Sequence, residues 1–391
     1  MPLDLLNVSS QVRRMGDFLV SRKGDEERRL RLAAEMLREL DWRDLAQRAE
    51  LVSERVAVPT GPLDERIPAP ARAATYTALA TDGSEIDPDR HGGTGDFFVI
   101  NVGRVRIPYG QPDRDVQLKS ATRIGYTDDD LFIVDASDPR RQVPMRDRHL
   151  DALRTVEELR ALAELAETEH DQHGDVPIVA LVDGTLLFSV LEERPRDFLR
   201  ARFYTDYVDQ LDRLRGADVA VAAYTSRTRG VDLVNLLRAV CGASPAACDR
   251  CGGGPACALR GLTDAQLLGP GLGQWARSPL FRVRSNVHDP YYGAHRVYFC
   301  LLQTGGEIAR IEMPEWVVQT PGQLALVHAV LVDQCAKGLG YPAVLARADD
   351  RAVVSPTDRQ VLDTLVRQEL ARRGFRVRPS AKLHRKQVRT V

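Results

Sequence analysis

Two apolar segments of the chain run directly into an aspartate that is followed by glycine and a hydroxyl residue. Residues 75–81 precede Asp82-Gly-Ser, and residues 177–182 precede Asp183-Gly-Thr. Short apolar runs bounded by turn residues are typical of buried strands, and the glycine is expected to let the backbone turn away beside the carboxylate. We therefore expect both aspartates at the carboxyl ends of strands, where ligands gather in α/β proteins.

The rest of the chain alternates strand-like and helical segments, which predicts an α/β fold with a central sheet covered by helices. Two of the strands are expected to be joined by a turn that contains Gly103. The expected strands are residues 75–80, 96–103, 105–109, 131–135, 177–183, 218–224, 296–303 and 308–312. The expected helices are residues 146–170, 196–215, 231–240, 264–268, 321–338, 341–348 and 356–373.

The segment boundaries follow from changes in composition along the chain. Residues 1–58 are expected to be an N-terminal helical segment, because apolar positions recur among many charges in two or three amphipathic helices that serve packing or oligomerisation. A proline-rich linker is expected at 59–74. The main domain then spans 75–378, with a Cys-rich insertion at 241–258, and a basic tail follows at 379–391.

Carboxylates that share a small volume repel one another unless a cation neutralises them. Oxygen ligands of this kind favour Mg²⁺ or Mn²⁺, and two such ions roughly 4 Å apart can assist phosphodiester cleavage by activating water and stabilising the leaving oxygen. Asp82 and Asp183 are therefore candidate metal ligands. The alternative is that Asp-Gly is a common turn pair with no chemical role.

Further acidic candidates come from other parts of the chain. The helix at 146–170 carries Glu157 and Glu158, and Glu158 lies closer to the border of the apolar face. A solvated position is the alternative for both. Asp349 and Asp350, in the C-terminal half, are a fourth acidic possibility.

The overall charge and cysteine usage limit the class of protein. The formal net charge is −1, so any surface that attracts nucleic acid must be local. Charged residues among the first 20 positions break up any secretory leader, and no uncharged apolar stretch approaches the roughly 18 residues of a membrane span. Six cysteines in a long chain that is expected to lack a leader indicate reduced thiols, and a cytoplasmic protein is expected.

A cysteine cluster and several basic residues remain. The cluster could hold a structural Zn²⁺, although its spacing differs from the usual pair of knuckles, and a loop with incidental thiols is the alternative. Arg227 could contact DNA phosphates or form a salt bridge. The tail could bind the DNA backbone or simply be a solubilising end. The cysteines are Cys241, Cys248, Cys251 and Cys257, and the tail residues are Lys382, Arg385 and Lys386.

Several separated motifs together resemble the NurA family of nucleases, which act with the HerA translocase. They occur in the family's order over about residues 75–391, which makes chance agreement improbable. The motifs are DGSEIDPDRH (82–91), FFVINVG (97–103), LVDGTL (181–186), AYTSRTR (223–229), EIARIEMPEW (307–316), YPAVL (341–345) and SPTDR (355–359).

The resemblance implies an RNase H-like core and a manganese- or magnesium-dependent nuclease that acts on single strands and 5′ ends. It also implies a homodimer and a hexameric HerA-type ATPase as partner. By position, Asp82 and Asp183 match the family's strand carboxylates, Glu158 its helical glutamate and Tyr341 its active-site tyrosine. The family has a histidine about eight residues after that tyrosine, where this chain has Asp349. Aspartate can bind the metal but cannot act as a neutral imidazole near pH 7.

The sequence thus predicts a metal-dependent DNA nuclease, with single-strand endonuclease and 5′-3′ exonuclease activity in end processing and double-strand break repair. A catalytically weak or inactive DNA-binding subunit of a HerA-like translocase is the first alternative, and another RNase H-like activity is the second. The expected catalytic residues are Asp82, Glu158, Asp183, Tyr341 and Asp349, with the four carboxylates as metal ligands.

Overall fold

The computed structural model describes residues 4–87, 97–188, 197–242, 257 and 259–375. They form two compact units, each of which combines segments that are distant in the sequence. The first unit contains the residues up to 69 and residues 225–311, and the second contains residues 70–224 and those from 312 onward. The expected domain at 75–378 therefore includes parts of both units. The N-terminal segment belongs with residues 225–311 because their strands pair with each other.

The second unit is built on five strands in the order β4-β3-β2-β7-β8. The first three strands along the chain pair antiparallel, whereas β7 runs parallel to β2 and β8 runs parallel to β7. This is the mixed sheet of an RNase H-like fold, as the motifs implied. The strands are β2 (Tyr76–Ile86), β3 (Phe98–Tyr109), β4 (Gln117–Gly125), β7 (Ile178–Asp183) and β8 (Ala220–Thr225).

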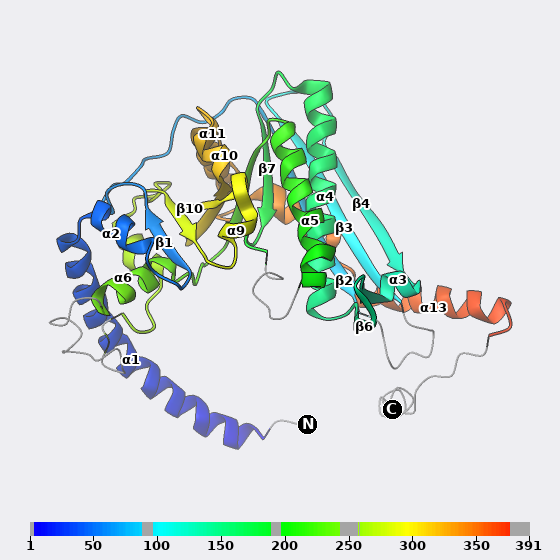
Figure 1. The fold of residues 1–391 in the computed structure, drawn as a ribbon, viewed down its shortest axis with the longest axis horizontal. Helices are drawn as coiled ribbons and strands as arrows, with labels where there is room; N and C mark the ends of the chain where they lie inside the picture. The colour runs from blue at the N-terminus through cyan, green and yellow to red at the C-terminus, as the bar shows by residue number, and fades with distance from the viewer. Residues whose placement is uncertain (1–3, 88–96, 189–196, 243–256, 258, 376–391) are drawn as a thin grey trace. The chain divides into compact units, whose positions relative to one another are not determined.

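Helices cover both faces of this sheet. Successive residues of a strand point to opposite faces. The side chains of Thr77 and Thr81 hydrogen-bond to α4 (Arg148–His173), which packs beside α5 (Asp197–Gly216; Figure 1). Those of Tyr76 and Ser84 hydrogen-bond instead to α11 (Gln323–Lys337) and α12 (Ala343–Ala352), respectively. Odd-numbered positions of β2 therefore face α4, and even-numbered positions face α11 and α12.

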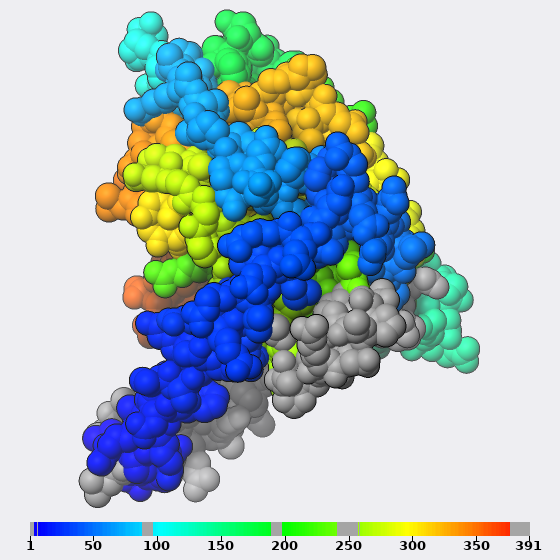
Figure 2. Space-filling model, turned by 90° about the vertical axis from the view of Figure 1, so that its left-hand side faces the viewer, coloured from blue at the N-terminus to red at the C-terminus, as the bar shows by residue number. Residues whose placement is uncertain are grey.

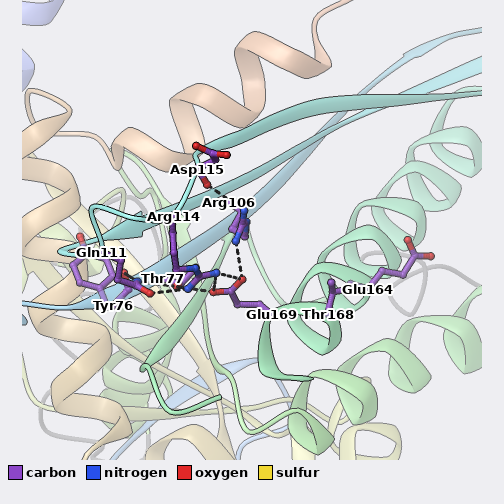
Figure 3. A network of polar contacts seen from close by, with 9 residues as sticks. All are labelled: Tyr76, Thr77, Arg106, Gln111, Arg114, Asp115, Glu164, Thr168 and Glu169. Atoms are coloured by element: carbon purple, nitrogen blue, oxygen red, sulfur yellow. Dashed lines mark hydrogen bonds and ion pairs between the residues drawn. The ribbon is translucent and has the colours of Figure 1, made fainter. Parts of the chain in front are cut away.

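A buried ion-pair network fixes the start of β2 against α4 (Figure 3). The carboxylate of Glu169 accepts hydrogen bonds from Arg114 at 2.6 and 2.7 Å, from Arg106 at 3.2 Å and from the hydroxyl of Thr77 at 2.8 Å. Burial acts to raise the pKa of Glu169, but these hydrogen bonds hold it below its ordinary value. Two guanidinium groups neutralise this one carboxylate, so we assign the network a structural role.

Among the described residues, the second unit also contains a two-stranded sheet and three further helices. A small antiparallel pair is formed by β5 (Phe132–Asp135) and β6 (Asp138–Pro144). The capping box of Ser355 and Asp358 begins the last helix, as expected for this pattern. The other helices are α3 (Asp128–Leu131), α10 (Glu315–Gln319) and α13 (Pro356–Arg372).

The first unit contains an antiparallel arrangement in which β9 pairs with both β1 and β10. Inside this unit Arg310 is buried and forms an ion pair with Asp232 at 2.6 Å. Its helices are α1 (Leu5–Glu39), α2 (Trp42–Ala49), α6 (Asp232–Gly242), α8 (Asp264–Leu268) and α9 (Asp289–Tyr292), with short 3₁₀ turns at Gly269–Gly271 and Gly293–His295. Its strands are β1 (Val56–Pro59), β9 (Phe281–Arg284), β10 (Val297–Gln303) and the beginning of β11 (Ile308–Pro314).

Within the described ranges, no helix combines the length and apolar character that crossing a membrane requires. This holds for the 35-residue α1 as well, because charged residues interrupt it throughout.

One expectation about the five-stranded sheet of the second unit is wrong, and one of its strands was not expected. Residues 96–109 were expected to form two strands, but Phe98–Tyr109 is one strand, and Gly103 lies inside it. A Cβ atom at Gly103 would overlap the carbonyl oxygen of Ala348, so the glycine provides room for α12 rather than a turn. Strand β4 was not expected, because most of its side chains are exposed and it lacks an apolar alternation.

Candidate active site

Asp82 and Asp183 lie on adjacent strands and point to the same face of the sheet. The parallel register of β2 and β7 aligns Thr81 with Val182, so the two aspartates are the next residues in each strand. Because Thr81 faces α4, both aspartates face α11 and α12. Each carboxylate lies close enough to influence the other, since the charge of Asp183 raises the pKa of Asp82.

The two Asp-Gly pairs have different backbones, which corrects the expectation that both end a strand. β7 ends at Asp183, and Gly184 has a left-handed φ of 94°, so the chain turns away there. β2 instead continues to Ile86, and Gly83 stays in the strand opposite Val102. Gly83 has a different role, since a Cβ atom there would lie 2.5 Å from Oε1 of Glu158 and would displace that side chain.

The C-terminal part of the chain adds two groups to this face. Asp349 lies within α12, which runs further than expected, and its charge raises the pKa of both strand aspartates. The hydroxyl of Tyr341, just before this helix, is hydrogen-bonded to Asp183. Tyr224 of β8 packs edge-on against Tyr341 with ring centroids 5.4 Å apart. The structure thus brings together Asp82, Asp183, Tyr341 and Asp349.

Negative charge is in excess on this face. Burial and the neighbouring charges of Asp183 and Asp349 raise the pKa of Asp82 to about 6, although the N–H of Gly83 opposes the shift. Burial also raises the pKa of Asp183, against the hydrogen bond from Tyr341. The pKa of Tyr341 is raised by burial and by Asp183, so its hydroxyl stays a proton donor at neutral pH. A cation placed among these groups would therefore be stabilised.

Glu158 approaches the same carboxylates from the α4 side of the sheet. Burial raises its pKa to about 7, Arg154 acts to lower it, and the charge of Asp82 raises it further. A cavity of about 210 Å³ is lined by both Glu158 and Asp183, together with Arg154. Glu157, the other helical candidate, instead pairs with Arg123 and Arg160, each at 2.7–2.8 Å.

The donor set fits a divalent cation, but its arrangement is incomplete. Mg²⁺ and Mn²⁺ prefer oxygen ligands, and either ion would reduce the repulsion among these buried carboxylates, whose pKa values are raised. Nowhere in the described part of the chain, however, are three His, Cys, Asp or Glu side chains grouped as a ready metal site. Glu158 is held by Arg154 at 2.8 Å, so it would have to leave this partner to join a cation at Asp183.

The other predicted site residues lie elsewhere. Asp350 is exposed and pairs with Arg347 at 3.2 Å. Arg227 forms an ion pair with Glu307 at 3.3 Å, while 86% of its side chain remains exposed. Cys257 is buried. The predicted zinc ligands Cys248 and Cys251, the side chain of Cys241, and the tail residues Lys382, Arg385 and Lys386 fall outside the described residues.

Three residues near the site were not identified from the sequence. Arg154 pairs with Glu158, and the spacing of four residues on one helix was a signal that could have found it. Glu85 also pairs with Arg154, at 2.6 Å. Glu312 is buried and accepts hydrogen bonds from the hydroxyl of Thr185 and the N–H of Leu186 at 2.7 and 2.8 Å, which secures the turn after Asp183. No local pattern reveals that last contact.

Comparison with known protein families finds a match to the NurA domain. The model of the NurA domain matches residues 76–354, which is more than half of the chain. The crystal structure of the NurA nuclease from Sulfolobus solfataricus is 14% identical, with a TM-score of 0.50 over 92% of this chain and 98% of that chain. A crystal structure of NurA with manganese is 9% identical, with a TM-score of 0.39 over 92% and 98% of the two chains. NurA bound to dAMP and manganese is 10% identical, with a TM-score of 0.37 over 76% and 88%. At these identities the Sulfolobus similarity concerns the fold alone, and no curated protein matches the chain.

Proposed function

The chain belongs to the NurA family, and on this premise we propose that it is a metal-dependent DNA nuclease. The observation that carries the proposal is the position of Asp82 and Asp183 on one face of adjacent strands, with Asp349 and Tyr341 beside them. Burial and neighbouring negative charge raise the pKa values of the two strand aspartates, as expected of carboxylates that a cation would neutralise.

The residues of this site have separate roles in the proposal. Asp82, Glu158, Asp183 and Asp349 would hold Mn²⁺ or Mg²⁺, with two ions as the expected number. When bound, such cations supply Lewis-acid activation of water and stabilisation of the leaving oxygen. The hydroxyl of Tyr341 stays protonated and donates to Asp183, and it would orient that carboxylate or a phosphate oxygen.

Asp349 stands where the family has a histidine. An aspartate keeps an oxygen ligand at this position but provides no imidazole to move a proton near pH 7. We therefore propose that Asp349 contributes as a ligand and by its charge, and that protons leave the site through water. A chain with this substitution is expected to retain metal binding, while its rate and pH dependence differ from those of relatives with histidine.

The biological setting is proposed from the family and from local charge. We propose single-strand endonuclease and 5′-3′ exonuclease activity in DNA end processing and double-strand break repair, by a homodimer that acts with a hexameric HerA-type ATPase. Arg227 and the tail residues Lys382, Arg385 and Lys386 are proposed contacts to the DNA backbone. Co-elution with a HerA-type ATPase tests the partner, and separate elution at micromolar concentration argues against it.

Cleavage of labelled single-stranded DNA by the purified chain tests the function. With Mn²⁺ we expect degradation that EDTA stops, and we expect Asp82→Ala to reduce the rate by at least about 100-fold without loss of folding. The matched control is Asp175→Ala, because Asp175 is an exposed aspartate that precedes the opposite end of β7. Full activity in Asp82→Ala would contradict the proposal.

The same assay with labelled DNA distinguishes a nuclease from the main alternative, a DNA-binding subunit without activity. A catalytically weak or inactive DNA-binding subunit would shift the labelled DNA on a gel without forming products, whether or not Mn²⁺ is added. The replacement of the family histidine by Asp349 is the observation that favours this alternative. A panel of RNA and branched DNA substrates in the same assay tests for another RNase H-like activity.

A further inference from the structure

Arg154 is surrounded by acidic groups on the α4 side of the site. Its guanidinium contacts Glu158 at 2.8 Å, Glu85 at 2.6 Å and Asp151 at 3.6 Å. It also donates a hydrogen bond to the backbone oxygen of Gly83 at 3.2 Å. Only 26% of its side chain is exposed, so solvent screens these interactions incompletely.

The backbone of β2 is adapted to this ion pair. A Cβ atom at Gly83 would lie 2.5 Å from Oε1 of Glu158 and 2.9 Å from Cγ of Arg154. The glycine therefore allows the pair to pack directly against the strand, one residue after Asp82. The charge of Arg154 also reaches the opposite face, where it lowers the pKa of both Asp82 and Asp183.

We propose that Arg154 is a positioning residue that holds Glu158 away from the metal and so sets the affinity of the site for divalent cations. The inference rests on the proposed nuclease function and deepens it. In the structure the guanidinium neutralises Glu158, which a cation bound at Asp82 and Asp183 would otherwise do. Binding of the metal therefore requires Glu158 to exchange one positive partner for another.

An arginine is suited to this role because it cannot lose its charge. The guanidinium stays protonated in proteins, so Arg154 can release Glu158 only by moving, and its charge repels an incoming cation until it does. The same charge offsets the repulsion among the carboxylates when no metal is bound. Arg154 thus stabilises the site without metal and weakens its affinity for metal.

The test is the binding of Mn²⁺ to the full-length chain, followed by the electron paramagnetic resonance signal of free Mn²⁺. We expect Arg154→Met to bind Mn²⁺ about tenfold more tightly than the unaltered chain, because the competing charge is removed. In EDTA the same variant is expected to unfold a few degrees lower, and Mn²⁺ is expected to restore its midpoint. Arg154→Lys keeps the positive charge and is expected to bind Mn²⁺ nearly as the unaltered chain does.

The matched control is Arg160→Met, six residues or about 1.7 turns further along α4. Arg160 also pairs with two carboxylates, Glu157 at 2.8 Å and Asp206 at 3.4 Å, and has a similar exposure of 32%. It lies outside the proposed metal site, so its loss is expected to leave Mn²⁺ affinity unchanged. Equal or weaker Mn²⁺ binding by Arg154→Met than by Arg160→Met would overturn the proposal. The nuclease assignment is judged separately, by Mn²⁺-dependent cleavage in the unaltered chain and its loss in Asp82→Ala.

Discussion

Gly83 and Gly184 follow the two site aspartates, and each supports the site for a different physical reason. Gly184 adopts a left-handed backbone that ends β7, which is the conformational freedom expected of glycine in a turn. Gly83 remains in an extended strand and leaves room for the side chains of Glu158 and Arg154, which a Cβ atom would displace. Identical dipeptides therefore support the same site by chain reversal in one strand and by close packing in the other.

Asp264 shows how a buried carboxyl without a matched charge behaves. It is fully buried in the first unit, and its Oδ2 atom has no hydrogen-bond partner. Burial and the neighbouring charge of Asp232 raise its pKa to about 6, against hydrogen bonds from backbone N–H groups and the charge of Arg310. The N–H of Val234 is one of these donors, at 3.0 Å.

This shift predicts a contribution to stability that depends on pH. Because the folded-state pKa of Asp264 lies above the unfolded value of 3.8, its contribution is fully present below pH 3.8 and is lost as the pH rises through about 6. The free energy of unfolding of Asp264→Asn, measured in urea at pH 4 and pH 7, is expected to fall less over this range than that of the unaltered chain. The difference should be roughly 2 kcal/mol, because part of the contribution is already lost at pH 4. If the free energy of unfolding changed equally with pH in the two proteins, this account would be contradicted.

At the scale of elements, α12 reaches the site because β3 has a glycine beneath it. The backbone of α12 at Ala348 lies against Gly103, and Asn101 and Ser84 donate hydrogen bonds to the backbone oxygen of Ala352 at the end of the helix. Asp349 is the next residue after the contact with Gly103. The position of this carboxylate relative to Asp82 therefore depends on how closely the helix and the strand pack.

Gly103→Ala tests this dependence. The added methyl group would overlap backbone atoms of α12, which cannot rotate away, so the whole helix must move. We expect a loss of roughly 1–3 kcal/mol in the free energy of unfolding and weaker Mn²⁺ binding by the folded protein. Gly216→Ala is the control, because no atom lies within 4 Å of the position of its Cβ. Unchanged Mn²⁺ affinity in a folded Gly103→Ala protein would show that Asp349 does not contribute to the metal site.

At the scale of the whole molecule, an apolar stripe runs along the N-terminal half of α1, the helix that Figure 2 shows in dark blue. The side chains recur at alternating intervals of three and four residues, the spacing of a coiled-coil seam. Four of the five are 49–61% exposed in the single chain, which is costly for residues of this type. The stripe consists of Leu5, Val8, Val12, Met15 and Leu19.

We therefore expect the proposed homodimer to depend on this stripe. Replacement of both Val12 and Met15 by glutamate places charges in the seam, and light scattering after gel filtration should then report the mass of one chain instead of two. Val116→Glu is the control, because Val116 is also about half exposed but lies outside the helix. A dimer that survives the double substitution would place the interface elsewhere.

Local patterns in the sequence were enough to predict most elements and the types of residue in the site. The apolar period of helices buried on one face predicted α4 and α5 to within a few residues, and continuous apolar runs predicted the buried strands β7 and β8. The resemblance implied an RNase H-like core with a mixed central sheet. Strands with little burial on either face, such as β4, carry no such period and were not predicted.

The convergence of the site was decided only by the tertiary structure. Asp82 and Asp183 face the same side because of the register between β2 and β7, which depends on residues far apart in the chain. The roles of Gly83 and Gly103 as sites of close approach depend on helices that arrive from other segments. The sequence by itself thus determined which chemical groups are present and the element each belongs to. Which groups neutralise one another, as Arg154 does Glu158, follows from distances that only the packed chain defines.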